Sequence, residues 1–364
     1  KKSINEITKA VTKIFHENCA SLNCLKPSVE PKATEHIKEM IEMTSSLISK
    51  GFAYENLGHV YFAINSFKDY GKLSNKKLEE LKAGNRIEVS ELKKNPLDFV
   101  LWKPSNDNEP GWKSPWGRGR PGWHLECSVM SEKYLGKNFD IHGGGLDLIF
   151  PHHENEIAQS CCNNNTKKFA NYWIHNGFVT INKEKMSKSL GNIVSISDAV
   201  KKYSGQVVRL ALLSAHYSQP LDWNDELLVN QEGILNKWYN LYSDEKSDVN
   251  EVDEVLLDDL NTPGFIARIH ELYNAASKGD ETKKQKFNQA CKLIGLFNIN
   301  KKEWESLKKS KIDVSESYIQ KKIEERHQAK ISGNFSLADK IREDLFLKGV
   351  LIEDQKGKTI WKLK

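Results

Sequence analysis

A short apolar strand that runs into three glycines and then into a helix constrains the fold of this chain more than any other feature. Residues 139–142 have the pattern of a buried strand, and residues 143–145 are all glycine. A helix is predicted to begin near Pro151, because proline suits the first helical turn. Residues 173–175 and 177–179 are further strand patterns. This order of elements predicts an α/β fold with a parallel sheet.

The residues before this unit predict two helices and a β-rich stretch. Apolar residues recur at helical spacing in residues 1–18 and again in residues 34–50, where Gly51 ends the helix. Residues 52–64 have the pattern of a hairpin. Residues 104–123 combine many prolines and glycines with tryptophans, which indicates an ordered binding loop rather than a floppy linker.

From about Ala199 the pattern is almost wholly helical and predicts a bundle. An acidic connector at residues 244–258 interrupts it. Residues 317–345 predict two more helices, and residues 350–352 and 359–361 predict a closing strand pair.

Composition excludes several classes of protein. Among 364 residues, 38% are apolar and 28% are charged, which is typical of a soluble globular protein and too polar for a membrane protein. Six scattered cysteines, two of them adjacent, do not resemble a secreted disulfide framework, so we expect a cytoplasmic protein. The net charge is only +5, but residues 317–364 hold 11 Lys and Arg against 7 Asp and Glu. A contact with a polyanion is therefore expected near the C-terminus.

The string Lys185-Met186-Ser187-Lys188-Ser189 is the first candidate site. Two lysines three apart, with two serines, form a cluster that can neutralise the charge on a pyrophosphate leaving group. The string is identical to the signature loop of class I aminoacyl-tRNA synthetases. The alternative is a solvated surface turn.

A metal set is the second candidate site. His152 and Glu156 lie four apart on a predicted helix, so both face one side, and Cys127 lies upstream on another element. Thiol, imidazole and carboxylate are all zinc ligands, and three protein ligands with an open position are typical of a catalytic zinc site. His153 is a rival ligand. The alternative is a surface His–Glu pair beside a buried thiol.

Residues 122–127 and 142–147 form the third candidate site. Trp123 and His142 are placed to wall a small pocket, and the glycines let a ligand approach the backbone. Asp147 is placed to accept a hydrogen bond from a ribose hydroxyl. The alternative is a core tryptophan beside a tight turn.

Residues 122–127, 139–160 and 185–192 together resemble the cysteinyl-tRNA synthetase family. Shorter stretches that also look like this family are residues 29–34, 70–74, 96–99, 214–217 and 338–342. The resemblance covers nearly the whole chain in the family's order. It implies a Rossmann-like class I catalytic domain, then an all-α anticodon-binding bundle, and then a small α+β C-terminal domain.

One departure from the family is large. The family's first Rossmann half should carry a His-Ile-Gly-His nucleotide motif and an early cysteine that is the fourth zinc ligand, and neither is in this sequence. Because the other motifs are intact, we expect that half to precede Lys1 in the complete protein, rather than this being an inactive remnant.

The resemblance implies a domain order and a role for the C-terminus. We expect four parts along the chain. The first is the second part of the catalytic domain (1–198, with a connective insertion at about 35–120). A stem-contact linker (199–225), a helical anticodon-binding bundle (226–310) and a small anticodon-recognition domain (315–364) follow it. Trp361 is expected to stack on an anticodon base. The alternative is a core residue of the small domain.

The resemblance also implies the pocket and its metal. Zinc held by Cys127, His152 and Glu156 would bind the thiolate of L-cysteine directly, and Trp123 and His142 would pack around the amino acid. Serine is nearly the same size as cysteine, so a soft metal is a stronger discriminator than packing. No editing domain is expected.

For ATP, used with Mg²⁺, the resemblance implies Lys188 as the main phosphate-stabilising residue, helped by Lys185. Ser187 and Asp147 complete the implied nucleotide contacts. The implied reaction joins cysteine to tRNA(Cys) by way of cysteinyl-adenylate, and a monomer is expected. Two alternatives remain: a non-catalytic tRNA-binding fragment, and the cysteine ligase of mycothiol synthesis, which lacks an anticodon domain.

Overall fold

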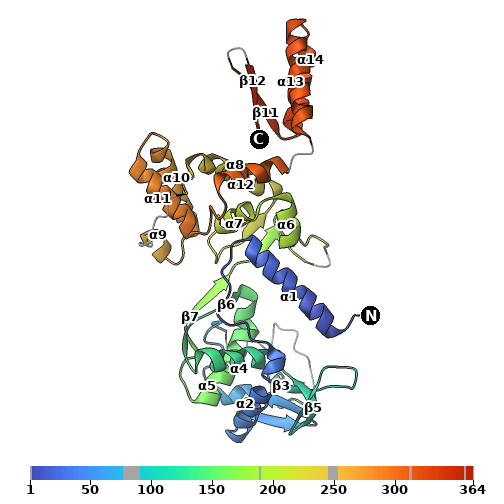
Figure 1. Ribbon diagram of the computed structural model, residues 1–364. Coiled ribbons are helices and arrows are strands. Elements are labelled where there is room, and N and C mark those ends of the chain that lie inside the picture. Colours follow the sequence, from blue (N-terminus) through green and yellow to red (C-terminus); the bar gives the residue numbers. More distant parts are fainter. Residues whose placement is uncertain are drawn as a thin grey trace. The chain divides into compact units, whose positions relative to one another are not determined.

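The structure is a computed structural model that describes residues 2–76, 91–187, 190–244, 253–310, 314–355 and 358–363. The chain divides into two compact units (Figure 1). The α/β unit comprises Lys26–Thr180 and Tyr217–Asp222, and the helical unit comprises Lys1–Leu25, Ile181–His216 and Trp223–Lys364. Within the described ranges, every helix is too short or too polar to cross a bilayer.

A five-stranded antiparallel sheet occupies one side of the α/β unit. Its strands, in the order β1-β2-β3-β5-β4, are β1 (Ala53–Asn56), β2 (His59–Phe62), β3 (Phe99–Pro104), β4 (Trp112–Ser114) and β5 (Gly117–Pro121). Helix α2 (Ile37–Ser49) buries Met40, Met43 and Leu47 in the core that this sheet forms. The hairpin at 52–64 is confirmed as β1 and β2. The stretch 104–123 differs from the predicted loop, because β4 and β5 pair within it.

Asp98 fastens the turn before β3 to the sheet. Its carboxylate is buried and accepts hydrogen bonds from the Tyr54 hydroxyl at 2.7 Å, the Ile64 amide at 2.9 Å and the Asn95 amide at 3.1 Å. Three donors satisfy a buried carboxylate that would otherwise be strongly unfavourable. The turn is therefore held in one conformation.

Four elements of the α/β unit lie around the candidate metal residues. The four elements are α4 (Trp123–Leu135), β6 (Phe139–Gly145), α5 (Glu154–Asn164) and β7 (Ala170–Asn176). The candidate metal residues are on the first three of these elements and in the turn before α5. Strands β6 and β7 are parallel, from Phe139 opposite Ala170 to Gly145 opposite Asn176, so the predicted parallel α/β arrangement is confirmed. Two irregular turns, Leu146–Leu148 and Ile149–His153, link β6 to α5.

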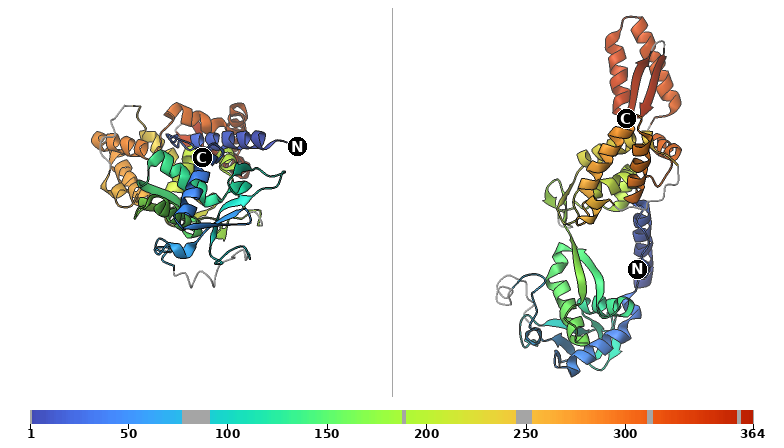
Figure 2. Two further views of the ribbon diagram at one scale, coloured as in Figure 1. Left: turned by 90° about the horizontal axis from the view of Figure 1, so that it is seen from below. Right: turned by 90° about the vertical axis from the view of Figure 1, so that its left-hand side faces the viewer.

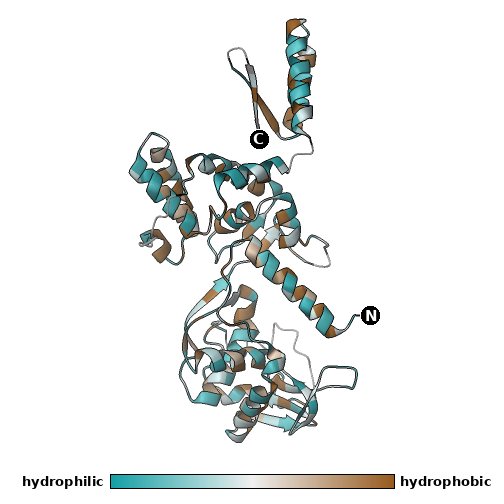
Figure 3. Ribbon diagram, in the orientation of Figure 1, coloured by the Kyte–Doolittle hydropathy of each residue, from teal (hydrophilic) through white to brown (hydrophobic). Residues whose placement is uncertain are grey.

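The helical unit begins with α1 (Ile4–Ser21), the predicted N-terminal helix. Figure 3 shows apolar and polar residues alternating along it, as in an amphipathic helix. Its apolar residues nevertheless lie exposed in the described part of the chain; they are Ile4, Ile7, Val11, Ile14 and Phe15.

The described residues after β7 include a three-stranded sheet in the order β10-β8-β9. Its strands are β8 (Val179–Ile181), β9 (Glu184–Lys185) and β10 (Leu221–Trp223). The helices that follow in the sequence are α6 (Ile196–Lys202), α7 (Gly205–Leu213), α8 (Asp225–Trp238), α9 (Glu254–Leu257), α10 (Thr262–Ala276), α11 (Glu281–Leu293) and α12 (Lys301–Ser310). This confirms the predicted helical character after Ala199.

Two side chains of α7 fix the turn that follows α11. The buried Gln206 accepts from the Phe297 amide at 2.6 Å and donates to the Tyr239 hydroxyl at 2.7 Å. One turn further along, Arg209 Nε donates to the Ile294 carbonyl at 2.6 Å. These bonds satisfy polar groups at the end of α11 that would otherwise be buried without partners.

The C-terminal part contains α13 (Glu316–Ile331), α14 (Phe335–Leu347), β11 (Val350–Gln355) and β12 (Lys358–Leu363). The antiparallel strand pair lies beside the two helices, as the right view of Figure 2 shows. The small core is formed by Ile319, Ile341, Leu345, Val350 and Ile352. The predicted pair of helices and closing strand pair are therefore confirmed.

Asp354 at the end of β11 joins α13 to the strand pair. It accepts two bonds from the buried Arg326, at 2.9 and 3.0 Å, and one each from Lys330 at 2.7 Å and Thr359 at 2.8 Å. The bonds from Arg326, then those from Lys330 and Thr359, hold the pKa of Asp354 well below its usual range. Its charged form therefore stabilises the folded state at neutral pH.

We expect Asp354→Asn to lower the free energy of unfolding of this part by about 1–2 kcal/mol at pH 7, since Asp354 is about half exposed and solvent screens the pair. A carboxyl with a depressed folded pKa loses its contribution as the pH falls below its unfolded value of about 4. The protection factors of β11 and β12 amides, which are corrected for the intrinsic exchange rate, should therefore fall as the pH drops below about 4 in the parent and change less in the variant. Equal exchange rates in both proteins at pH 7 would contradict the assignment.

Candidate metal centre and active site

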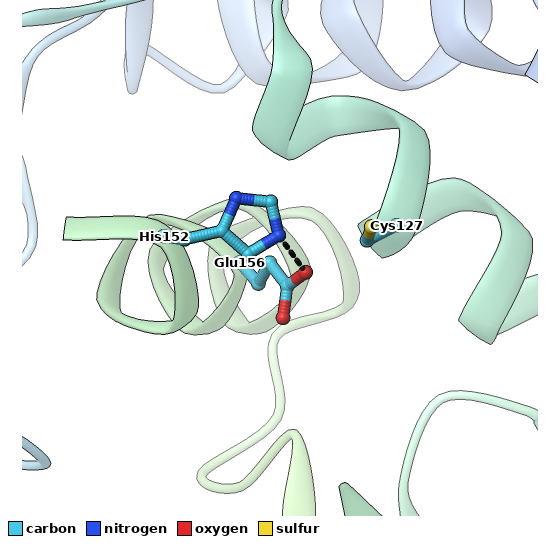
Figure 4. A group of neighbouring side chains, drawn as sticks. All are labelled: Cys127, His152 and Glu156. Carbon is cyan, nitrogen blue, oxygen red and sulfur yellow. Dashed lines mark ion pairs between the residues drawn. The ribbon is translucent and has the colours of Figure 1, made fainter. Parts of the chain in front are cut away.

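Three potential zinc ligands converge from two helices. Cys127 lies in the second turn of α4, and Glu156 lies in the first turn of α5. His152 is the second-last residue of the irregular turn before α5, four residues before Glu156, and both side chains face α4. The ligand atoms of the three residues lie within 4.8 Å of one another. Figure 4 shows Cys127 on one helix and His152 and Glu156 on the facing segment. His152 Nε2 is 2.9 Å from Glu156 Oε1.

The carboxylate of Glu156 fits a cation. It is fully buried, and its oxygens lie 2.8 Å from His142 Nε2 and 2.9 Å from His152 Nε2. None of the described side chains makes an aligned hydrogen bond to either oxygen, although the two imidazoles and the Cys127 thiol all face the carboxylate. Burial raises the pKa of Glu156, but the two imidazoles lower it by more and hold it at about 2. A buried, ionised carboxylate without aligned donors is a group that a metal ion would complement.

Cys127 needs a cation in order to ionise. Burial, and then the charge of Glu156, raise the pKa of the Cys127 thiol to about 12. A thiol in this setting is protonated at neutral pH, whereas a coordinated thiol is deprotonated. The donor set of thiol, imidazole and carboxylate therefore fits zinc.

Four further histidines surround these ligands. His142, His153 and Glu156 form a second group of possible ligands, so the rival ligand His153 is also close to the carboxylate. His124 and His175 complete the cluster: His124 Nδ1 is 2.8 Å from His152 Nδ1, and His175 Nε2 is 2.8 Å from His153 Nδ1. The sequence reasoning missed these last two. His124 could have been noticed because it lies three residues before Cys127. His175 could have been noticed because it lies on a predicted strand, which in the structure is parallel to the strand that contains residues 139–142.

Burial, and then the neighbouring His152, lower the pKa of His124 to about 4. His124 is therefore neutral at physiological pH, and one of the two facing nitrogens carries the proton of the hydrogen bond. Such a bond fixes the ring orientation of His152 and leaves its Nε2 directed at Glu156.

The predicted pocket residues flank the metal group. The Trp123 ring lies 4.3 Å from the His152 ring, centre to centre, and its side chain is 60% exposed, so it is not a core tryptophan. His142 packs its ring against Phe169 and Trp173. Asp147 lies exposed in the turn after β6.

The lysine loop lies in the helical unit. Lys188 lies outside the described residues, as does the side chain of Lys185 at the end of β9. Ser187 is described: its amide donates to Asn192 Oδ1 at 2.9 Å, and its hydroxyl accepts from the Leu190 amide at 3.3 Å. These bonds join Ser187 to Leu190 and Asn192, which flank Lys188 in the sequence.

Trp361 lies in β12 opposite Ile352 and packs, partly buried, against the small C-terminal core. This packing gives the tryptophan a structural role. Its stacking on an anticodon base stays a prediction.

Comparisons with known proteins place the chain in a family. A family profile described as "tRNA synthetases class I (C) catalytic domain" matches residues 1–233. A cysteine–tRNA ligase from Pelagibacter ubique is 57% identical over 365 residues, covering all of this chain and 81% of that protein. A cysteine–tRNA ligase from Paramagnetospirillum magneticum is 48% identical over 373 residues, covering 99% of this chain and 81% of that protein.

The fold also matches a solved structure of Mycobacterium tuberculosis methionyl-tRNA synthetase bound by methionyl-adenylate. The TM-score is 0.50 at 13% identity, covering 86% of this chain and 74% of that one. This likeness concerns the fold, and the predicted class I architecture is confirmed. The names of the curated relatives favour neither a non-catalytic tRNA-binding fragment nor the mycothiol ligase. The chain belongs to the cysteinyl-tRNA synthetases, class I ligases that use ATP to join cysteine to tRNA.

Proposed function

We propose that Cys127, His152 and Glu156 bind a zinc ion in the cysteine pocket, and that this site gives the enzyme its selectivity. The observation that supports the proposal is the convergence of three donor atoms within 4.8 Å around a buried carboxylate without aligned donors. When bound, zinc supplies a soft Lewis acid that coordinates the thiolate of cysteine and lowers the pKa of its thiol.

The pocket walls orient the amino acid and contribute less to selectivity. The exposed face of Trp123 offers an apolar surface beside His152, and His142 lies on the opposite oxygen of Glu156. Serine differs from cysteine by one atom, and packing alone distinguishes such pairs by only about 1–3 kcal/mol. The enzyme requires no editing domain if the zinc site distinguishes the sulfur of cysteine from the oxygen of serine.

The lysine loop serves the activation step. The carboxylate of cysteine attacks the α-phosphorus of ATP, which carries Mg²⁺; a new oxygen–phosphorus bond forms and pyrophosphate leaves. Lys188, helped by Lys185, neutralises the charge that develops on the leaving group. Ser187 holds the loop conformation and faces the phosphates, and Asp147 accepts from the ribose.

The remaining domains serve the tRNA. Its 3′-terminal ribose hydroxyl attacks the carbonyl of the adenylate, and AMP leaves. Residues 199–225 contact the acceptor stem side, and residues 226–310 and 315–364 bind the anticodon region of tRNA(Cys), with Trp361 at the edge of that surface. We infer that the enzyme is a monomer. We also infer that it acts in the cytoplasm, where the six cysteines, which are free in the structure, would stay reduced.

Anomalous scattering tests the metal site. We expect about one zinc ion per molecule of the complete enzyme, with a zinc-edge difference peak between Cys127, His152 and Glu156. A peak beside His142 and His153 instead would move the site to the second group of ligands. A crystal grown with zinc that shows no peak at either group would overturn the proposed function.

A further inference from the structure

Cys127 and the other two proposed ligands lie on separate helices. The spacing of α4 and α5 therefore decides whether the thiol can reach a metal bound by His152 and Glu156. Zinc accepts sulfur near 2.3 Å and nitrogen or oxygen near 2.0–2.2 Å, with a tolerance of about 0.2 Å. A contact that fixes the two helices close to the ligands would set the metal affinity.

One buried hydrogen bond joins α4 to α5 beside the ligand atoms. The Ser128 hydroxyl donates to Gln159 Oε1 at 2.6 Å, and both residues are fully buried. Ser128 directly follows Cys127, and Gln159 lies one helical turn after Glu156. On the other side of Cys127, the contact between His124 and His152 joins the same two segments. The thiol is thus bracketed between two side-chain contacts.

The amide nitrogen of Gln159 indicates that this glutamine does not stabilise the fold. Its Nε2 is buried, and no described group accepts a hydrogen bond from it. A buried donor without a partner lowers stability, and an apolar side chain of similar shape would avoid that loss. Glutamine at this position therefore contributes little to folding, whereas its carbonyl oxygen holds Ser128.

We propose that the Ser128–Gln159 hydrogen bond is a positioning contact for the metal centre: it sets the distance between the Cys127 thiol and the pair formed by His152 and Glu156. This inference rests on the proposed zinc site. It differs from a structural role in a measurable way, because loss of the bond should lower the metal affinity without lowering the metal-free stability.

The test is a double variant, Ser128→Ala with Gln159→Met, which removes both polar groups and keeps the volume near that of the parent. Zinc affinity, measured by competition with a chromophoric chelator, should fall about 10- to 100-fold. Cobalt(II) bound in place of zinc should show weaker visible absorption, because the sulfur ligand is displaced from the tetrahedral position. The urea midpoint of the chain in EDTA should be unchanged or higher.

Tyr70→Phe is the matched control. The Tyr70 hydroxyl donates to Asn155 Oδ1 at 2.5 Å, and this buried bond also anchors α5 but does not involve α4. Its loss should lower the urea midpoint and leave zinc affinity within about twofold of the parent. If the double variant does not fold, Ser128→Ala alone keeps the glutamine and should still weaken zinc binding.

The outcomes separate the two proposals. A parent chain that binds zinc, with variants that bind it equally well, overturns the positioning role and leaves the zinc site standing. A complete parent enzyme that binds no zinc overturns the zinc site and, with it, this inference. A lower urea midpoint with unchanged zinc affinity shows a purely structural bond and also overturns it.

Discussion

Replacing Lys188 by alanine is expected to slow cysteinyl-adenylate formation by about 100- to 1,000-fold, the effect of removing one preorganised charge from a transition state. Affinity for cysteine should stay within about threefold of the parent value, because the amino acid binds at the other side of the reacting phosphorus. ATP–pyrophosphate exchange by the complete enzyme, measured over a range of cysteine concentrations, separates the two quantities. The expectation comes from the identity of residues 185–189 with the class I signature loop.

Lys201→Ala is the control, since it removes the same charge from α6 in the same unit. Lys201 is exposed and pairs with Asp198 on its own helix. The exchange rate of this variant should lie within about twofold of the parent, as expected for an exposed pair. Equal losses of rate and of cysteine affinity in Lys188→Ala would contradict a transition-state role.

Local periodicity explains which parts of the site could be predicted. The four-residue spacing of His152 and Glu156 placed both on one face of a helix, and the structure has them 2.9 Å apart. The parallel sheet followed from one strand, three glycines and a second strand. These features depend on neighbours in the sequence, which composition and spacing describe well.

Features set by long-range packing could not be predicted. Neither His124 nor His175 stood out as a site residue, because their partners, His152 and His153, lie 28 and 22 residues away. The choice between His152 and His153 as ligand depends on where α4 lies, which spacing along α5 does not encode. Strands β4 and β5 were missed because they are short and rich in glycine and tryptophan, a composition typical of loops.

The exposure of helix α1 also differs from what its sequence pattern indicates. The helix and its apolar stripe were predicted, but the burial that such a stripe normally indicates is absent in the described residues. Periodicity reports the conformation of a segment. It does not report which surface covers the segment.

Replacing a proposed zinc ligand should have the second large effect. Cys127→Ser or His152→Ala should reduce zinc content to well below one per chain and reduce the preference for cysteine over serine to at most about 200-fold, the limit for packing alone. Serine at position 127 keeps the size of the side chain but is a far poorer ligand for zinc than a thiolate. Zinc analysis, together with kcat/KM for activation of each amino acid by the complete enzyme, measures both effects.

Cys24→Ser is the matched control, because Cys24 is an exposed free thiol outside the metal group. It should keep both zinc and selectivity, since only a thiol beside the imidazole and the carboxylate completes the ligand set. If the Cys127→Ser variant lost its zinc and still preferred cysteine over serine by far more than 200-fold, the residues that line the pocket would have to distinguish sulfur from oxygen. Trp123 and His142 offer only ring surfaces and one imidazole for that purpose. We therefore assign discrimination beyond about 3 kcal/mol to the proposed metal.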